Sequence, residues 1–252
     1  MSAAHILEVK NLGRWFGAFK ALDGVSARFG LNRVTAVIGP NGAGKSTLFN
    51  ILSGALRPST GSIFFKGTDL GQTPQHEFVH LGIARTYQIT NVFPHLTAHE
   101  NVRIAAQAFR SRYNIWTPRS SLHEISAHAD QVLVDVGLGA RRARLAALLS
   151  HGEQRALEIA IALVANPQLL LLDEPTAGMG PEETKQMIVL IEHLAQARTI
   201  LLVEHKMKMV LGLCDRILVL HLGRLIADGT PTEIRSDAFV RAVYLGQSDG
   251  YA

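Results

Sequence analysis

One eight-residue segment constrains the fold of this chain more than any other: residues 39–46 read Gly-Pro-Asn-Gly-Ala-Gly-Lys-Ser. The apolar, β-branched run Val34–Ile38 precedes the segment, and a helical pattern from Lys45 to Leu52 follows it. Glycines let the backbone N–H groups of such a loop turn inward around phosphates, and the N-terminus of the next helix adds its positive dipole. The order of strand, loop and helix therefore predicts a binding site for the phosphates of a nucleotide.

Two side chains at the end of this loop carry the predicted chemistry. Lys45 supplies a full positive charge to the β- and γ-phosphates, and the hydroxyl group of Ser46 can ligate Mg²⁺. We therefore expect the chain to bind ATP together with Mg²⁺. The residues expected to contact the nucleotide here are Gly39, Pro40, Asn41, Gly42, Ala43, Gly44, Lys45, Ser46 and Thr47.

A second apolar run, residues 169–172, is predicted to be a buried strand and ends in two carboxylates, Asp173 and Glu174. Two adjacent acids at a strand end can simply be solvated, so a functional role for this pair depends on the phosphate loop in the same chain. Together with the phosphate loop, Asp173 is expected to hold Mg²⁺, and Glu174 is expected to polarise the attacking water as general base. The sequence thus predicts hydrolysis of the nucleotide as well as binding.

Strand and helix patterns alternate along most of the chain, whereas residues 97–165 are almost wholly helical. We therefore expect an α/β core with a parallel sheet covered on both faces, split by a helical insertion. The ligand should lie at the carboxyl ends of the strands. The expected strands are 6–9, 25–29, 34–38, 62–65, 169–172, 199–203 and a hairpin of 217–222 with 225–228, and the expected helices are 45–52, 98–109, 122–136, 152–165, 181–195 and 207–214.

Composition excludes several classes of protein. Hydrophobic residues make up 47% of the chain, enough for a sizeable core, but no stretch of about 18 apolar residues could cross a bilayer. The net charge of +4 comes without a block of like charges, so no nucleic-acid partner is expected. The single cysteine, Cys214, excludes an intrachain disulfide, and the first ten residues lack a signal-peptide core. We expect a cytoplasmic protein that reaches a membrane only through partners.

The chain resembles the ATP-binding subunits of ABC transporters over nearly its whole length. Residues 149–153, Leu-Ser-His-Gly-Glu, are similar to the signature of that family, Leu-Ser-Gly-Gly-Gln, and stand before a predicted helix and ahead of the acidic strand. In the family, two ATPase domains pair head to tail, with each ATP between the phosphate loop of one and the signature of the other. The resemblance implies that Ser150, Gly152 and Glu153 contact an ATP bound by a second subunit.

The same resemblance assigns three further residues. Gln88 is similar to the glutamine at the entry to the helical insertion, which ligates Mg²⁺ and reports the nucleotide state to the membrane subunits. His205 follows the strand 199–203 and is similar to the switch histidine, which contacts the γ-phosphate and orders the attacking water. Phe16 resembles the aromatic residue that stacks on adenine, although Trp15 and Phe19 are nearby.

A narrower resemblance points to the branched-chain amino acid uptake ATPases, a group with relatives that serve urea, amides and aromatic acids. It implies a bacterial importer, at the cytoplasmic face of the inner membrane, with a second ATPase subunit, two permeases and a periplasmic binding protein. It also implies a single domain, 1–252, with a P-loop NTPase core of residues 1–88 and 166–252, an N-terminal antiparallel β subdomain and a helical insertion of residues 89–165. The segments that carry this resemblance are residues 82–88, 149–152, 177–184 and 244–246.

Two departures from the family pattern stand out. His151 and Glu153 replace a glycine and a glutamine of the signature, and Gly180 stands where an aspartate is usual. The second change leaves the cross-talk between the two ATP sites open. The transported solute, and whether the second ATPase subunit is identical to this chain, also stay open at this level.

Other functions explain the residues less well. An ABC-type ATPase of DNA repair or translation would usually carry two ATPase domains or a long coiled coil, but this chain has one phosphate loop and no heptad run. A P-loop kinase or GTPase would leave Leu-Ser-His-Gly unexplained, and an inactive scaffold would not need Lys45, Asp173, Glu174 and His205 together. Residues 76–80 match the zinc pattern H-E-x-x-H, but they lie inside the nucleotide domain and lack the extended metzincin spacing. We expect no functional zinc there.

Overall fold

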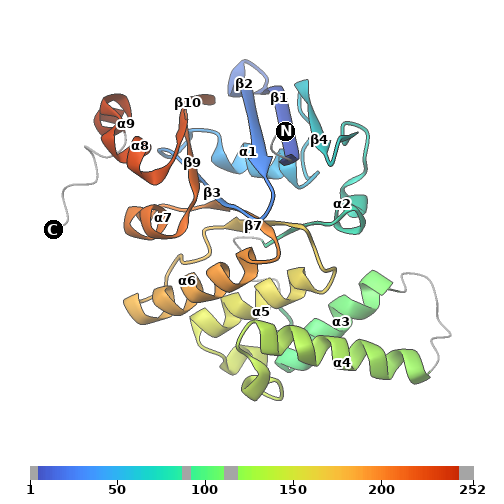
Figure 1. The fold of residues 1–252 in the computed structure, drawn as a ribbon. Coiled ribbons are helices and arrows are strands. Elements are labelled where there is room, and N and C mark those ends of the chain that lie inside the picture. The colour runs from blue at the N-terminus through green and yellow to red at the C-terminus, as the bar shows by residue number, and fades with distance from the viewer. Residues whose placement is uncertain (1–4, 87–91, 111–118, 244–252) are drawn as a thin grey trace.

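Two β-sheets and a layer of helices lie above one another in the computed structural model, which describes residues 5–86, 92–110 and 119–243 (Figure 1). The upper sheet is antiparallel, with strand order β2-β1-β4-β5. The central sheet has the order β10-β9-β3-β8-β7-β6. The strands are β1 (His5–Phe16), β2 (Phe19–Gly30), β3 (Val34–Ile38), β4 (Thr60–Phe65), β5 (Thr68–Asp69), β6 (Ile83–Arg85), β7 (Leu169–Asp173), β8 (Thr199–Val203), β9 (Arg216–His221) and β10 (Arg224–Gly229).

The central sheet confirms the predicted parallel core. The strands β9, β3, β8, β7 and β6, in this order across the sheet, pair in parallel with their neighbours. Strand β10 pairs antiparallel with β9 as the predicted hairpin. Strands β3, β7 and β8 are buried at every position, as expected for strands covered on both faces. The antiparallel upper sheet confirms the N-terminal β subdomain, but β1 and β2 are longer than predicted. Apolar alternation marks residues 6–9 at the start of β1 and 25–29 near the end of β2, whereas pairing continues through irregular register into exposed residues such as Trp15 and Phe16.

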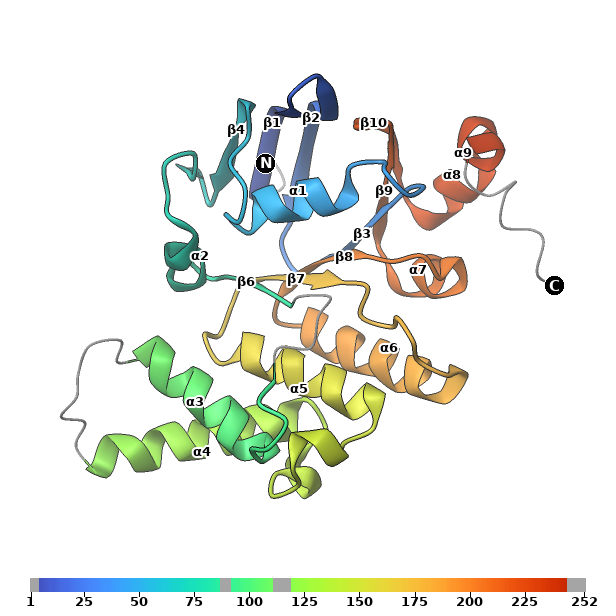
Figure 2. The ribbon, with the colours of Figure 1, turned by 180° about the vertical axis from the view of Figure 1, so that it is seen from behind.

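Helices cover both faces of the central sheet. Helix α1 lies between the two sheets, and α5 and α6 lie below the central sheet with α3 and α4 beneath them (Figure 2). The helices are α1 (Lys45–Leu52), α2 (Gln75–Leu81), α3 (Ala98–Arg110), α4 (Arg119–Asp135), α5 (His151–Leu163), α6 (Pro181–Ala195), α7 (Met207–Leu213), α8 (Pro231–Ser236) and α9 (Ala238–Val243), with 3₁₀ turns at Gly139–Arg141 and Ala146–Leu148. The helices and strands that the sequence did not predict are all short, with two to seven residues each: α2, α8, α9, β5 and β6.

The alternation of side chains along the central strands divides the core into two clusters. Leu171 and Leu201 face the side of α1 and the upper sheet, whereas Leu170 and Leu202 face the helical side. On the helical side, they join a cluster that includes Leu157 of α5. Because α5 and α6 are packed against the sheet in this way, the segments at their N-termini are held in fixed positions relative to the strand ends.

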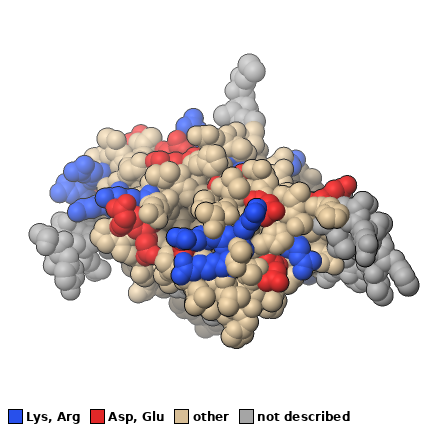
Figure 3. Space-filling model, turned by 90° about the horizontal axis from the view of Figure 1, so that it is seen from below, with Lys and Arg blue, Asp and Glu red and all other residues tan. Residues whose placement is uncertain are grey.

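The outer face of the helical layer carries charges of both signs, with uncharged surface between them (Figure 3). In this part of the chain, Arg141 pairs with Glu153 at 3.1 Å, and Arg142 lies 3.7 Å from Asp130. Within the described residues, no helix combines the length and the apolar character that a membrane span requires.

Candidate functional site

The predicted site residues stand at the carboxyl ends of three adjacent strands. The phosphate loop follows β3, Asp173 and Glu174 end β7, and His205 follows β8, which lies between β3 and β7 in the sheet. Parallel strands present these ends at one edge, where ligands bind in open α/β sheets. Gln88 lies beyond β6 and outside the described residues, so its assignment stays a prediction.

The phosphate loop has the backbone conformation that its glycines permit. Gly39 and Gly44 have φ values of 152° and 103°, in a region that other residues rarely adopt. Space is also limiting, because a Cβ atom at Gly39 would lie 2.1 Å from the carbonyl oxygen of Leu220, and one at Gly44 would lie 2.6 Å from that of Ala21. The close approach of β2 and β9 therefore holds the loop in shape. Helix α1 then begins at Lys45, with Gly44 as an N-cap that provides no side chain.

Lys45 is held inside the loop. Its ammonium group donates hydrogen bonds to the carbonyl oxygens of Gly39 at 2.7 Å and Pro40 at 2.9 Å, and the residue is 7% exposed. Burial lowers the pKa of this ammonium group, and the carboxylates of Glu174 and Asp173 oppose that shift. The positive charge thus lies between the loop and the acidic strand end, where a nucleotide triphosphate would need it.

Glu174 and His205, predicted separately as general base and switch histidine, lie within hydrogen-bond distance of each other. The Nε2 atom of His205 lies 2.9 Å from Oε1 of Glu174, and both residues line a pocket of about 210 Å³ together with Lys45 and Ser46. Glu174 has a φ of 47°, which is unusual for a residue with a side chain and costs on the order of 1–3 kcal/mol. This strained turn directs the carboxylate into the pocket instead of continuing the strand.

Two arginines with buried side chains support the acidic turn, and neither is among the predicted site residues. Arg155 of α5 donates from Nη2 to the carbonyl oxygens of Asp173 at 2.6 Å and Glu174 at 3.2 Å. Arg85 of β6 pairs its Nη2 atom with Oδ2 of Asp173 at 2.9 Å. Arginines inside otherwise apolar segments were the available signal, because a buried charge requires partners. Besides a local ion pair of Arg155 with Glu158, however, the acceptors at the end of β7 come from a distant part of the chain.

Residues on either side of His205 tie it to the segment after Glu174. Glu204 is 3% exposed and accepts hydrogen bonds from the backbone N–H groups of Thr176 at 3.0 Å and His205 at 2.8 Å. The ammonium group of Lys206 donates to the carbonyl oxygens of Thr176 at 3.0 Å and Met179 at 3.1 Å. The turn that carries the histidine and the loop 176–180 are therefore held as one unit.

The donors at the strand ends fit Mg²⁺. Mg²⁺ prefers oxygen ligands and is usually held by one or two carboxylates together with substrate phosphates. Ser46 lines the pocket, and Asp173 lies at the end of β7 with one carboxylate oxygen, Oδ2, bound to Arg85. These residues supply the hard oxygen donors that such an ion needs, and the described ranges contain no group of three or more His, Cys, Asp or Glu residues that could hold a metal ion without the nucleotide.

The signature lies away from this pocket. Ser150 is the N-cap of α5: its side chain accepts a hydrogen bond from the backbone N–H group of Glu153, and the Glu153 carboxylate accepts one from the Ser150 N–H group. Of the described residues that line the phosphate-loop pocket, none belongs to 150–153. The chain therefore does not bring its own signature to its own phosphate loop.

The structure shows the surroundings of the aromatic residue that was predicted to stack on adenine. Phe19, not Phe16, lines the phosphate-loop pocket, and the ring of Phe16 lies 4.8 Å from the guanidinium group of Arg14. The adenine contact of Phe16 thus stays a prediction, with Phe19 as a second candidate.

The two histidines of the H-E-x-x-H match lie on α2. There, His76 lies 3.2 Å from Glu77, and His80 stacks on Phe109 with ring centroids 5.0 Å apart.

Comparisons with known proteins agree with this geometry. The sequence matches the ABC transporter family over residues 22–177 and the branched-chain amino acid ATP-binding cassette transporter family over residues 224–250. It is 38% identical to the high-affinity branched-chain amino acid transport ATP-binding protein BraF of Pseudomonas aeruginosa, and the match covers 96% of this chain and 98% of BraF. It is 37% identical to the corresponding protein LivG of Escherichia coli K12, with the same coverage of both chains.

A solved structure shares the fold over almost the whole chain. The crystal structure of an ATP-binding cassette of an ABC transporter in its ADP conformation superposes with a TM-score of 0.87 at 32% identity, and the match covers 96% of this chain and 99% of that one. The phosphate loop, the acidic strand end and the histidine after β8 are thus set in an established ATPase scaffold. The chain belongs to the ABC transporter family of ATP-binding proteins, in the branch of the branched-chain amino acid transport ATPases.

Proposed function

We propose that this ABC ATPase is one of two ATPase subunits that power a bacterial importer of branched-chain amino acids or related small solutes. One observation carries the proposal of a composite site: Glu174, His205 and Lys45 share one pocket, whereas the signature of the same chain lies outside it. A second subunit that pairs head to tail would supply the missing signature. The likeness of this chain to BraF and LivG supports the choice of solute.

The roles proposed for the residues follow from their positions. Lys45 and the backbone N–H groups of the loop bind the β- and γ-phosphates, and Ser46, Asp173 and Gln88 would hold Mg²⁺, which would neutralise phosphate charge. Glu174 accepts the proton of the attacking water. His205, already within hydrogen-bond distance of Glu174, orients that water and contacts the γ-phosphate.

The partners follow from the same proposal. We propose that two permeases on other chains, served by a periplasmic binding protein, form the solute pathway, and the likeness of this chain to the transport ATP-binding proteins BraF and LivG supports this. The ATPase then works at the cytoplasmic face of the inner membrane as a peripheral subunit. Gln88, at the entry to the helical insertion, would report the nucleotide state to the permeases.

Uptake by the assembled transporter tests the solute assignment. We expect vesicles that contain this chain with its permeases, second ATPase and binding protein to take up labelled leucine when ATP is on the side of the ATPases. An excess of unlabelled isoleucine or valine should reduce the uptake, and an excess of glutamate should not. Uptake of another solute class, with no competition from branched-chain amino acids, would contradict the assignment.

A further inference from the structure

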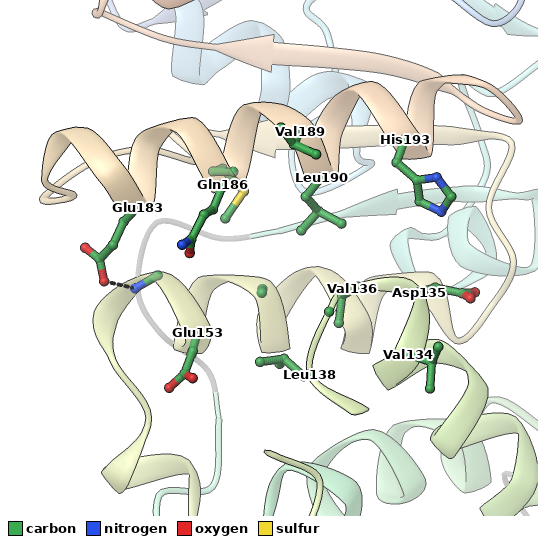
Figure 4. A pocket seen from close by; sticks show the side chains of 14 residues that line it. Val134, Asp135, Val136, Leu138, Glu153, Glu183, Gln186, Val189, Leu190 and His193 are labelled. Atoms are coloured by element: carbon green, nitrogen blue, oxygen red, sulfur yellow. Dashed lines mark hydrogen bonds between the residues drawn. The ribbon is translucent and has the colours of Figure 1, made fainter. Parts of the chain in front are cut away.

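The signature of this chain is held by a carboxylate of the same chain. Glu183, in the first turn of α6, accepts hydrogen bonds at Oε1 from the hydroxyl of Ser150 at 3.1 Å and from the backbone N–H group of Gly152 at 3.1 Å. Figure 4 shows this side chain directed at the start of α5, with the bond to Gly152 drawn as a dashed line. A single carboxylate oxygen thus accepts hydrogen bonds from two donors of the signature.

The surroundings favour a negative charge at this point. The donors stand at the N-terminus of a 13-residue helix, whose dipole attracts anions. The hydrogen bond from Gly152, followed by the one from Ser150, lowers the pKa of the Glu183 carboxyl group from its usual value. Glycine at position 152 permits the contact, because a Cβ atom there would lie 3.1 Å from Oε1 of Glu183.

The same two donors, Ser150 and Gly152, are among the residues that the resemblance assigns above to an ATP bound by the second subunit, where they would contact its γ-phosphate. A donated proton can serve only one acceptor well, and two anions at one place repel each other. The carboxylate and the phosphate therefore compete for the signature.

We propose that Glu183 is a built-in competitor of the γ-phosphate: its carboxylate occupies the signature in the unpaired chain and leaves when ATP on the second subunit arrives. The inference rests on the composite site of the proposed function. A pocket of about 460 Å³ beside Glu183, also lined by Gln186 and Leu190, gives the side chain room to move (Figure 4).

The competition has a consequence for nucleotide selection. ADP has no γ-phosphate to replace the carboxylate. A chain whose partner subunit holds ADP therefore keeps the hydrogen bonds between its signature and Glu183. ATP can offer an anion of higher charge to the same donors. Glu183 thereby raises the amount of ATP needed for pairing and disfavours pairing on ADP.

The test measures ATP-driven pairing in a chain that also carries Glu174→Gln, so that bound ATP persists. The concentration of Mg-ATP that gives half-maximal dimer is determined by light scattering after size-exclusion chromatography, for the chain with itself and for the chain mixed with the second ATPase subunit. Glu183→Gln keeps the shape and an acceptor oxygen but removes the charge. Glu182→Gln is the matched control, because Glu182 is exposed in the same turn and pairs with Lys185.

We expect Glu183→Gln to lower the half-maximal ATP concentration about tenfold, since charge-assisted hydrogen bonds are worth at least about one decade of affinity. Glu182→Gln should leave it unchanged, and ATP binding to the single chain, followed with a fluorescent ATP analogue, should be the same in all variants. An unchanged or raised midpoint for Glu183→Gln would overturn the competitor role, a raised one indicating that Glu183 only shapes the signature. Absence of ATP-driven pairing in every variant and both mixtures would instead contradict the composite site itself.

Discussion

Glu174→Gln should bind Mg-ATP with nearly unchanged affinity and hydrolyse it about 10²–10⁴-fold more slowly, the range that general-base catalysis contributes. The amide keeps the shape of the carboxylate but cannot accept the proton of the attacking water. This loss corresponds to roughly 3–5 kcal/mol in the barrier, at about 1.4 kcal/mol per decade. Phosphate release under saturating ATP measures the rate, and a fluorescent nucleotide titration measures the affinity.

Two matched variants separate the base from its neighbours. Glu192→Gln makes the same chemical change at an exposed position of α6 and should keep the wild-type rate. Asp173→Asn should weaken productive Mg-ATP binding itself, and it also disturbs the buried pair with Arg85. Hydrolysis by Glu174→Gln at the wild-type rate, where the wild type is clearly active, would remove Glu174 from the role of base.

Lys45→Ala should weaken ATP binding by about 10²-fold or more. The variant loses a buried charge that faces the phosphates, and hydrogen bonds to charged groups are worth about 1.5–3 kcal/mol each. Isothermal titration with Mg-ATP gives the affinity, and Lys185→Ala, an exposed lysine on α6, is the control.

The fold without nucleotide should tolerate the Lys45 substitution. Removing the ammonium group frees the carbonyl oxygens of Gly39 and Pro40 but also relieves the burial of a charge, so the two effects oppose each other. The melting temperature without ligand should therefore change little. An affinity equal to that of the wild type, in a variant that melts normally, would argue against a phosphate-binding role of Lys45.

Local patterns in the sequence predicted the parts of the site that depend on local structure. The phosphate loop is recognisable because its strand, glycines and helix are contiguous. Helix α6 and strand β8 were predicted with the bounds that the structure shows, since Pro181 marks the helix start and β8 is a short buried run. The resemblance then supplied His205, which the structure brings to Glu174.

Long-range contacts could not be predicted in this way. Arg155 reaches the carbonyl oxygens of Asp173 and Glu174 only because α5 packs under the sheet. Glu204 meets Thr176 because β7 and β8 are neighbours, and Glu183 meets the signature across the α5–α6 contact. Sequence spacing carries no sign of these pairs, since each depends on the assembled layers. For the same reason, the sequence could not show which of Phe16 and Phe19 lines the phosphate-loop pocket.

The dependence of hydrolysis on pairing tests the composite site most directly. The rate of phosphate release per chain is measured over a range of protein concentrations that spans the change from monomer to dimer, for the chain alone and mixed with its second ATPase subunit. Because each phosphate loop needs the signature of a partner, the rate per chain should rise with concentration and level off once the chains are paired. A rate per chain that stays constant down to concentrations at which the protein is fully monomeric would contradict the account.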